Sequence, residues 1–187
     1  MNGCNGGGFR VNSFALVSYI PDPLATFLDR LRNDLVSECH AKAHVTVLPP
    51  RPLICAPGEA WNQTHTRLQD FQPFLVELGE IAVFPVTEVI YVSVKAGGSE
   101  LQKLHAALNR GGVEFVEPFC YHPHITLAQD LPPGQLADAR QIAAGRWHDF
   151  RAARSFVVDE LTFVQNTIDN CWTDLQKWRL SSSVASR

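Results

Sequence analysis

The segment His44-Val45-Thr46-Val47 is matched 80 residues later by His124-Ile125-Thr126-Leu127. In each segment a polar residue alternates with an aliphatic residue over four positions. Side chains at positions i and i+2 of a β-strand project from the same face. The two segments, called here the first and second motif, therefore predict two strands. Each would bury its aliphatic residues and present a histidine and a threonine on its other face.

The sequence around the motifs repeats with the same offset, since Glu80 and Ile81 match Glu160 and Leu161. In each half an apolar strand precedes an amphipathic helix, the motif strand, a second helix and further strand sequence. A period this long indicates duplication of a whole structural unit rather than a solenoid repeat. The expected strands are 14–20, 44–48, 74–84, 89–94, 122–128, 156–164 and 172–180, and the expected helices are 23–36, 58–70, 99–109 and 134–144.

These elements predict an α+β fold that is bilobal. Two lobes related by a pseudo-twofold axis, each with a mainly antiparallel sheet and flanking helices, would enclose a cleft between them. We expect a flexible glycine-rich leader at 1–12, one bilobal domain at 13–180 and a tail at 181–187. Within the domain the internal repeat would divide the chain at about 13–86 and 87–180.

The composition is that of an ordinary globular protein, with 45% hydrophobic residues and a net charge of -3. This charge argues against long duplex nucleic acid as a partner, because such binding needs clustered Lys and Arg. The five cysteines are odd in number and form no C-x-x-C pair, which favours free thiols over disulfides or a thiolate zinc site. No apolar run is long enough to span a membrane. We therefore expect a cytoplasmic monomer with no membrane partner.

A facing pair of histidines suits acid–base chemistry on a phosphodiester. One neutral imidazole takes a proton from water or a ribose hydroxyl, and a protonated imidazole gives a proton to the departing oxygen. Both forms are accessible near neutrality because the unperturbed pKa of histidine is ~6.5. Threonine hydroxyls can donate hydrogen bonds to the non-bridging phosphate oxygens. We predict that His44 and His124 are catalytic and that Thr46 and Thr126 bind phosphate. One such motif alone would more often hold a half-buried structural histidine, and the duplication favours catalysis.

On these motifs, with Pro123 before the second, the chain resembles the two-histidine phosphoesterases, which include the bacterial 2'-5' RNA ligases and the RNA 2',3'-cyclic phosphodiesterases. Motif spacing, repeat and length extend the resemblance over nearly the whole chain. The resemblance implies a bilobal fold, no metal, no cofactor, and hydrolysis of 2',3'-cyclic phosphates to 2'-phosphates or of 2'-5' linkages. The implied substrates are RNA 3' ends or small cyclic nucleotides. Several members carry arginine where this chain has Gln129, which hydrogen-bonds but brings no charge.

Three further polar residues are candidate substrate contacts. Lys42 and His122 each precede a motif histidine by two residues, so on an extended strand they would share its face. Arg51 follows Pro49-Pro50 and could reach an outer phosphate. The alternative for all three is a solvated strand end or loop. The aromatic residues suited either to stacking on a base or to core packing are Tyr19, Phe119 and Tyr121.

Two other functions remain open. His44, His122 and His124 could bind zinc, since a histidine pair at i and i+2 occurs in zinc sites, but this gives the threonines no role. A non-catalytic RNA- or nucleotide-binding module is the second alternative, although arginine or lysine would serve phosphate binding better. The duplicated pairing of histidine with threonine favours the enzyme.

Overall fold

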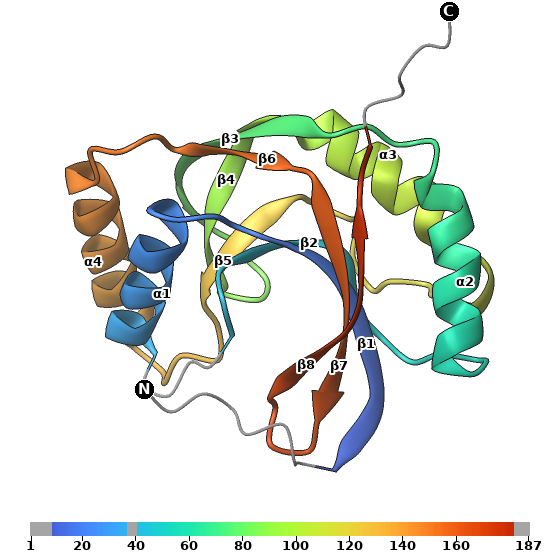
Figure 1. Ribbon diagram of the computed structural model, residues 1–187. Coiled ribbons are helices and arrows are strands. Elements are labelled where there is room, and N and C mark those ends of the chain that lie inside the picture. Colours follow the sequence, from blue (N-terminus) through green and yellow to red (C-terminus); the bar gives the residue numbers. More distant parts are fainter. Residues whose placement is uncertain (1–8, 37–40, 182–187) are drawn as a thin grey trace, which may run out of the picture.

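The computed structural model describes residues 9–36 and 41–181. Every predicted helix and strand is present, with corrections at some boundaries (Figure 1). Residues 1–8 of the predicted leader and 182–187 of the predicted tail lie outside the described residues. The first strand begins at Arg10, within the range 1–12 that was predicted as the leader. The elements in chain order are β1 (Arg10–Tyr19), α1 (Leu24–Leu35), β2 (His44–Arg51), α2 (Pro57–Leu68), β3 (Phe74–Val83), β4 (Ile90–Ala96), α3 (Gly98–Leu108), η1 (Gly111–Val113), β5 (His124–Ala128), α4 (Leu136–Asp149), β6 (Ser155–Val158), β7 (Glu160–Thr167) and β8 (Trp172–Arg179).

The strands form two four-stranded antiparallel sheets, in the orders β2-β1-β7-β8 and β5-β4-β3-β6. The motif strands β2 and β5 occupy equivalent places, as do β1 and β4, and β7 and β3. The two orders therefore correspond, in agreement with the predicted pseudo-twofold, bilobal α+β architecture. The lobes do not coincide with the two halves of the sequence, however. Strand β3 pairs with β4 of the second half, and β7 pairs with β1 of the first half.

The strand predicted at 156–164 is two strands that belong to different sheets. β6 pairs with β3, whereas β7 pairs with β1 and β8, and the chain crosses between the sheets at Asp159. Val158 and Leu161, on either side of this crossing, are both 0% exposed. The apolar pattern therefore continues across the break, which is why the sequence predicted one strand.

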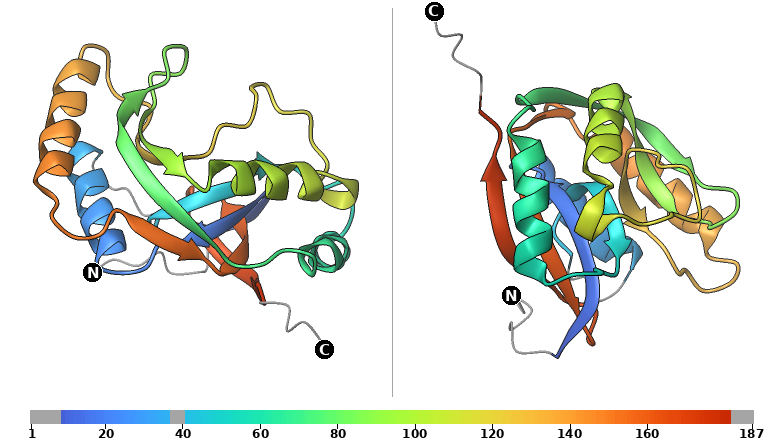
Figure 2. Two further views of the ribbon diagram at one scale, coloured as in Figure 1. Left: turned by 90° about the horizontal axis from the view of Figure 1, so that it is seen from above. Right: turned by 90° about the vertical axis from the view of Figure 1, so that its right-hand side faces the viewer.

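The helices cover the sheets in pairs. α1 contacts α4 and β5, and α2 contacts α3, which in turn contacts β2 (Figures 1 and 2). Leu24, Leu28 and Leu31 form the buried stripe of α1 at helical spacing. α4 begins and ends later than the predicted 134–144. Gly134 has a φ of 85°, outside the helical region, and the buried Trp147 keeps the helix packed near its end.

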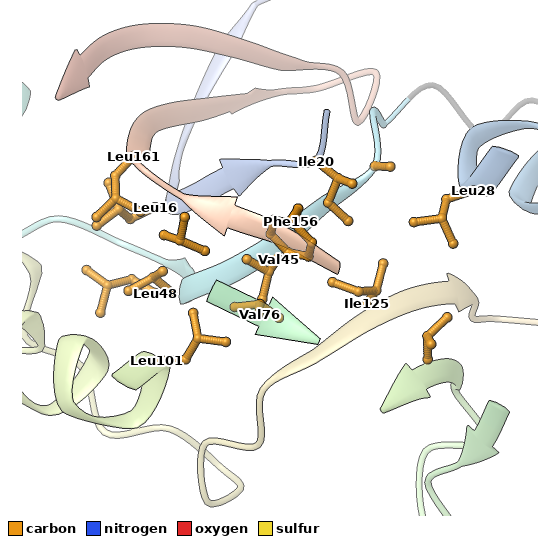
Figure 3. Close-up of a cluster of buried hydrophobic side chains, with 14 of the residues drawn as sticks. Leu16, Ile20, Leu28, Val45, Leu48, Val76, Leu101, Ile125, Phe156 and Leu161 are labelled. Carbon is orange, nitrogen blue, oxygen red and sulfur yellow. The ribbon is translucent and has the colours of Figure 1, made fainter. Parts of the chain in front are cut away.

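One hydrophobic core joins both lobes. Val45 and Ile125, each next to a motif histidine, are 0% exposed and lie in the same cluster as Val76 and Phe156 (Figure 3). Burying a side chain of this size stabilises the fold by ~1.5–3 kcal/mol. A one-residue shift of either strand would turn these side chains out and the histidines in, so burial fixes which face carries the motif.

The prediction of free thiols has different outcomes at different cysteines. Cys55 and Cys120 carry free thiols. Cys171 is disulfide-bonded, so the expectation of free thiols is wrong at that position. In the stretches 9–36 and 41–181, none of the helices combines the length and the apolar character that a bilayer crossing requires.

Candidate functional site

The two motifs come together at the junction of the two sheets. β2 and β5 are edge strands of their sheets, and they contact each other (Figure 1). His44, Thr46, His124 and Thr126 are all half-buried, whereas the residue after each of them is buried. The predicted alternation is therefore present in both strands.

The neighbouring strand of each sheet presents an equivalent pair of residues to each motif. On β1, Tyr19 lies opposite His44 and Val17 lies opposite Thr46. On β4, Ser93 lies opposite His124 and Tyr91 lies opposite Thr126. Directly opposed residues of an antiparallel pair share a face, so these side chains border the two histidines.

Both motif imidazoles are held in the same way. Nδ1 of His44 lies 2.6 Å from the carbonyl oxygen of Lys42, and Nδ1 of His124 lies 2.6 Å from that of His122. A carbonyl only accepts hydrogen bonds, so we assign the proton of each neutral ring to Nδ1. The lone pair is then on Nε2, which makes no hydrogen bond to the protein within the described residues. Each ring thus offers one nitrogen for proton transfer.

Lys42 and His122 therefore orient the motif histidines through their backbone rather than their side chains. Neither residue belongs to a strand, since β2 and β5 begin at the histidines and Pro123 lacks the N–H that a ladder needs. The Lys42 ammonium lies 5.5 Å from the centroid of the Tyr19 ring, and the imidazole of His122 is exposed. Direct contact of either side chain with a substrate stays a prediction.

Arg32 makes the surroundings of the two histidines unequal. Its guanidinium is buried and donates to the carbonyl oxygens of Ala41 at 2.8 Å and Lys42 at 3.1 Å. The second of these oxygens also holds His44. Arg32 was not predicted from the sequence, although its place on the apolar face of α1 beside Leu28 and Leu31 indicated that it is buried.

The pKa of His44 is lowered from 6.5 to about 4, mainly by burial; the hydrogen bond to the Lys42 carbonyl opposes the shift, and the positive charges of Arg32 and His124 add to it. Burial also lowers the pKa of His124; the hydrogen bond to the His122 carbonyl opposes this shift, and the charge of the His122 side chain adds slightly to it. Both rings are therefore neutral near pH 7, with Nε2 able to accept a proton.

Two aromatic residues that the sequence analysis missed account for part of this burial. Phe84 and Tyr91 stack with their centroids 4.1 Å apart, and their centroids lie 5.0 and 5.3 Å from that of His124. Phe84 directly follows β3 and Tyr91 lies in β4, so no local pattern links them to the second motif. Tyr19, by contrast, was predicted and lies beside the first motif.

Arg51 lies elsewhere than predicted. It is 2% exposed, donates to Asn109 Oδ1 at 2.6 Å and to the Val113 carbonyl at 3.1 Å, and forms an ion pair with Glu117. Strand β2 continues through Pro49-Pro50 to Arg51 and carries it into the interior. These partners occupy the guanidinium, which argues against contact between Arg51 and a substrate phosphate.

The zinc alternative finds no geometric support. Across the described ranges, no three or more His, Cys, Asp or Glu side chains gather closely enough to hold a metal ion. His44, His122 and His124 therefore do not converge on one point. The centroids of the last two rings are 6.4 Å apart.

The lowered pKa of His44 makes the stability of the fold depend on pH. The unfolded chain binds this proton near pH 6.5, but the folded chain binds it only near pH 4. The stabilisation from the neutral buried ring is present above pH 6.5 and is lost as pH falls toward 4, by up to about 1.4 kcal/mol per pH unit. Denaturant unfolding should show a steeper loss in this window for the wild type than for His44→Ala. The exposed His148 is the control, and His148→Ala should keep the wild-type slope. Parallel curves for wild type and His44→Ala would contradict this prediction.

Comparison with known proteins gives one consistent result. A family model described as the 2'-5' RNA ligase superfamily matches residues 20–170. A Bacillus cereus (strain B4264) protein named as a phosphoesterase is 25% identical to this chain over 146 residues. The aligned region covers 73% of this chain and 82% of that protein. The crystal structure of E. coli LigT complexed with 3'-AMP superposes with a TM-score of 0.63 at 15% identity, covering 94% of this chain and 99% of that one. The crystal structure of TT0787 of Thermus thermophilus gives a TM-score of 0.58 at 18% identity, covering 91% and 99%.

Proposed function

The chain belongs to the 2'-5' RNA ligase superfamily, and on that basis we propose that it is a phosphodiesterase that opens 2',3'-cyclic phosphates of RNA ends or nucleotides. The observation that carries the proposal is the matched pair of imidazoles on adjoining edge strands. Each is held at Nδ1 by a backbone carbonyl and offers Nε2 for proton transfer. Acid–base chemistry on one phosphate needs two such groups.

In the proposed reaction the neutral histidine takes a proton from water at Nε2 while the water oxygen bonds to phosphorus. The bond between phosphorus and the 3' oxygen breaks, and its electron pair stays on that oxygen. The 3' oxygen takes a proton from Nε2 of the other, protonated histidine, which leaves a 2'-phosphate. The hydroxyls of Thr46 and Thr126 donate to the non-bridging oxygens, where negative charge is held in the transition state.

The negative charge of the substrate favours protonation of one histidine by solvent. Both histidines have lowered pKa values in the free protein, so neither is protonated near pH 7. An anionic phosphate between them favours the charged form of the nearer ring and raises its pKa. Substrate binding and protonation of one histidine are then coupled.

A panel of phosphodiesters tests the proposal. The full-length protein would be incubated with 2',3'-cyclic nucleotides, with an oligoribonucleotide ending in a 2',3'-cyclic phosphate and with a 2'-5' linked dinucleotide. We expect turnover of the cyclic phosphates to 2'-phosphates, identified by chromatography against both phosphate isomers. The complex of E. coli LigT with 3'-AMP supports the choice of nucleotides. Tight binding of all three without turnover would instead indicate a non-catalytic nucleotide-binding module.

Removal of metal should leave this activity intact. The proposed reaction assigns every proton transfer and every phosphate contact to histidine and threonine side chains, so it needs no Lewis acid. We expect the initial rate after exhaustive dialysis against a chelator to equal the rate before it. Loss of turnover that returns on adding zinc would contradict this prediction and support a zinc-dependent enzyme.

A further inference from the structure

A polar cluster of the buried Arg51 and the half-buried His105, Glu117 and Tyr121 lies beside the first motif and has no part in the reaction described above. We propose that Tyr121 is a positioning residue that fixes the two motif strands relative to each other. The inference rests on the proposed function, because the position that matters is that of the two histidines about one phosphate.

Tyr121 links the two motifs directly. Its hydroxyl donates to the backbone carbonyl of Thr46 in β2 at 2.7 Å. The next residue along the chain, His122, supplies the carbonyl that holds His124. One side chain therefore connects the backbone of the first motif to the segment that orients the catalytic ring of the second.

The ring of Tyr121 is itself held in place. It stacks on the imidazole of His105 with centroids 4.0 Å apart and planes 4° from parallel. Nδ1 of His105, on α3, lies 2.9 Å from the carbonyl oxygen of Val47, the residue after Thr46. Two consecutive carbonyls of β2 thus have partners from α3 and the segment before β5. β2 is an edge strand, and its pairing with β1 is irregular between Thr46 and Leu48, so the ladder is interrupted where these carbonyls lie.

The segment between α3 and β5 also contacts Arg51, which lies at the far end of β2. Glu117 forms an ion pair with Arg51, and its Oε1 lies 3.5 Å from Nε2 of His105. Arg51 also donates to Asn109, whose side chain holds Phe115 through both backbone groups, at 3.0 and 2.9 Å. A buried ion pair is a weak means of stabilising a fold. Here the ion pair fixes the position of the segment that leads into the second motif.

The variant Tyr121→Phe tests the inference because it removes one hydroxyl and leaves the stacked ring. We expect kcat for a cyclic phosphate to fall ~10-fold, since small misplacements of catalytic groups are costly, while KM changes by less than ~2-fold. Thr64→Val is the matched control. The Thr64 hydroxyl also donates to a buried carbonyl, that of Ala60 at 2.8 Å, but within α2. It should lower the melting temperature and leave kcat unchanged.

Two further measurements separate positioning from general stability. Tyr121→Phe combined with Thr46→Val should cost less than the product of the single effects, because the hydroxyl acts through the strand that carries Thr46. By NMR, the imidazole resonances of His44 and His124 should shift in Tyr121→Phe and stay in place in Thr64→Val. The NMR comparison needs no turnover, so it tests Tyr121 even if the proposed activity fails. A lower melting temperature with unchanged kcat and unchanged resonances would overturn the inference.

Discussion

Replacing His44 or His124 with alanine is expected to lower turnover of a 2',3'-cyclic phosphate by ~10²–10⁴-fold, the usual contribution of a positioned proton-transfer group. Each variant removes the Nε2 that the backbone carbonyl of Lys42 or His122 aims into the site. Removing the second histidine after the first should cost far less than additivity predicts, because the two rings act on one phosphate. Steady-state kcat for both single variants and the double variant checks this.

The pH profile and a surface variant are the controls. General acid–base catalysis needs one neutral and one protonated ring at once, so wild-type rates should give a bell-shaped profile that belongs to the coupled pair. His148→Ala, at an exposed position on α4, should keep wild-type kcat. A single sigmoid in the wild type, or near-normal turnover in either alanine variant of the motifs, would exclude the two-histidine mechanism.

Replacing Thr46 or Thr126 with valine is expected to lower kcat/KM by up to ~10²-fold, the effect of losing one donor to a charged oxygen in the transition state. Valine keeps the β-branched shape, so both strands should retain their register and the melting temperature should change little. The bell-shaped profile should survive, because both histidines remain. Kinetics across the pH range on both variants would measure the effect.

Thr66→Val provides the matched control for the threonine variants. Thr66 is exposed on α2, and its hydroxyl donates to the carbonyl of Asn62 one turn earlier in the same helix. This variant should retain wild-type kcat/KM. Full activity in Thr46→Val and Thr126→Val together would show that neither hydroxyl contacts the phosphate.

The parts of the site that follow from local pattern were predictable. Alternation of polar and apolar residues put Val45 and Ile125 in the core and the histidines on the opposite face. The repeat of that pattern predicted that two such faces exist. Both inferences depend only on the period of a strand and on the cost of exposing apolar side chains.

Residues whose role depends on distant partners were not predictable in this way. Arg51 follows two prolines and resembles a loop residue, but its ion-pair partner Glu117 is 66 positions away. Arg32 acts through a carbonyl of the segment before β2, and only its place on an apolar helix face hints at burial. The crossing at Asp159 is hidden because buried residues flank it on both sides.

The exchange of β3 and β7 between the sheets has a consequence for how the chain can fold. A polypeptide made of the first half alone would have no β4 for its third strand to pair with, and its own sheet would lack β7. Neither half alone can therefore form the strand pairing seen in the full chain, and separately produced halves should recover that pairing only when mixed. Because β3 and β7 occupy equivalent places, two copies of the repeated unit that exchanged their third strands in a domain-swapped dimer, and were then joined in one chain, would give the present topology.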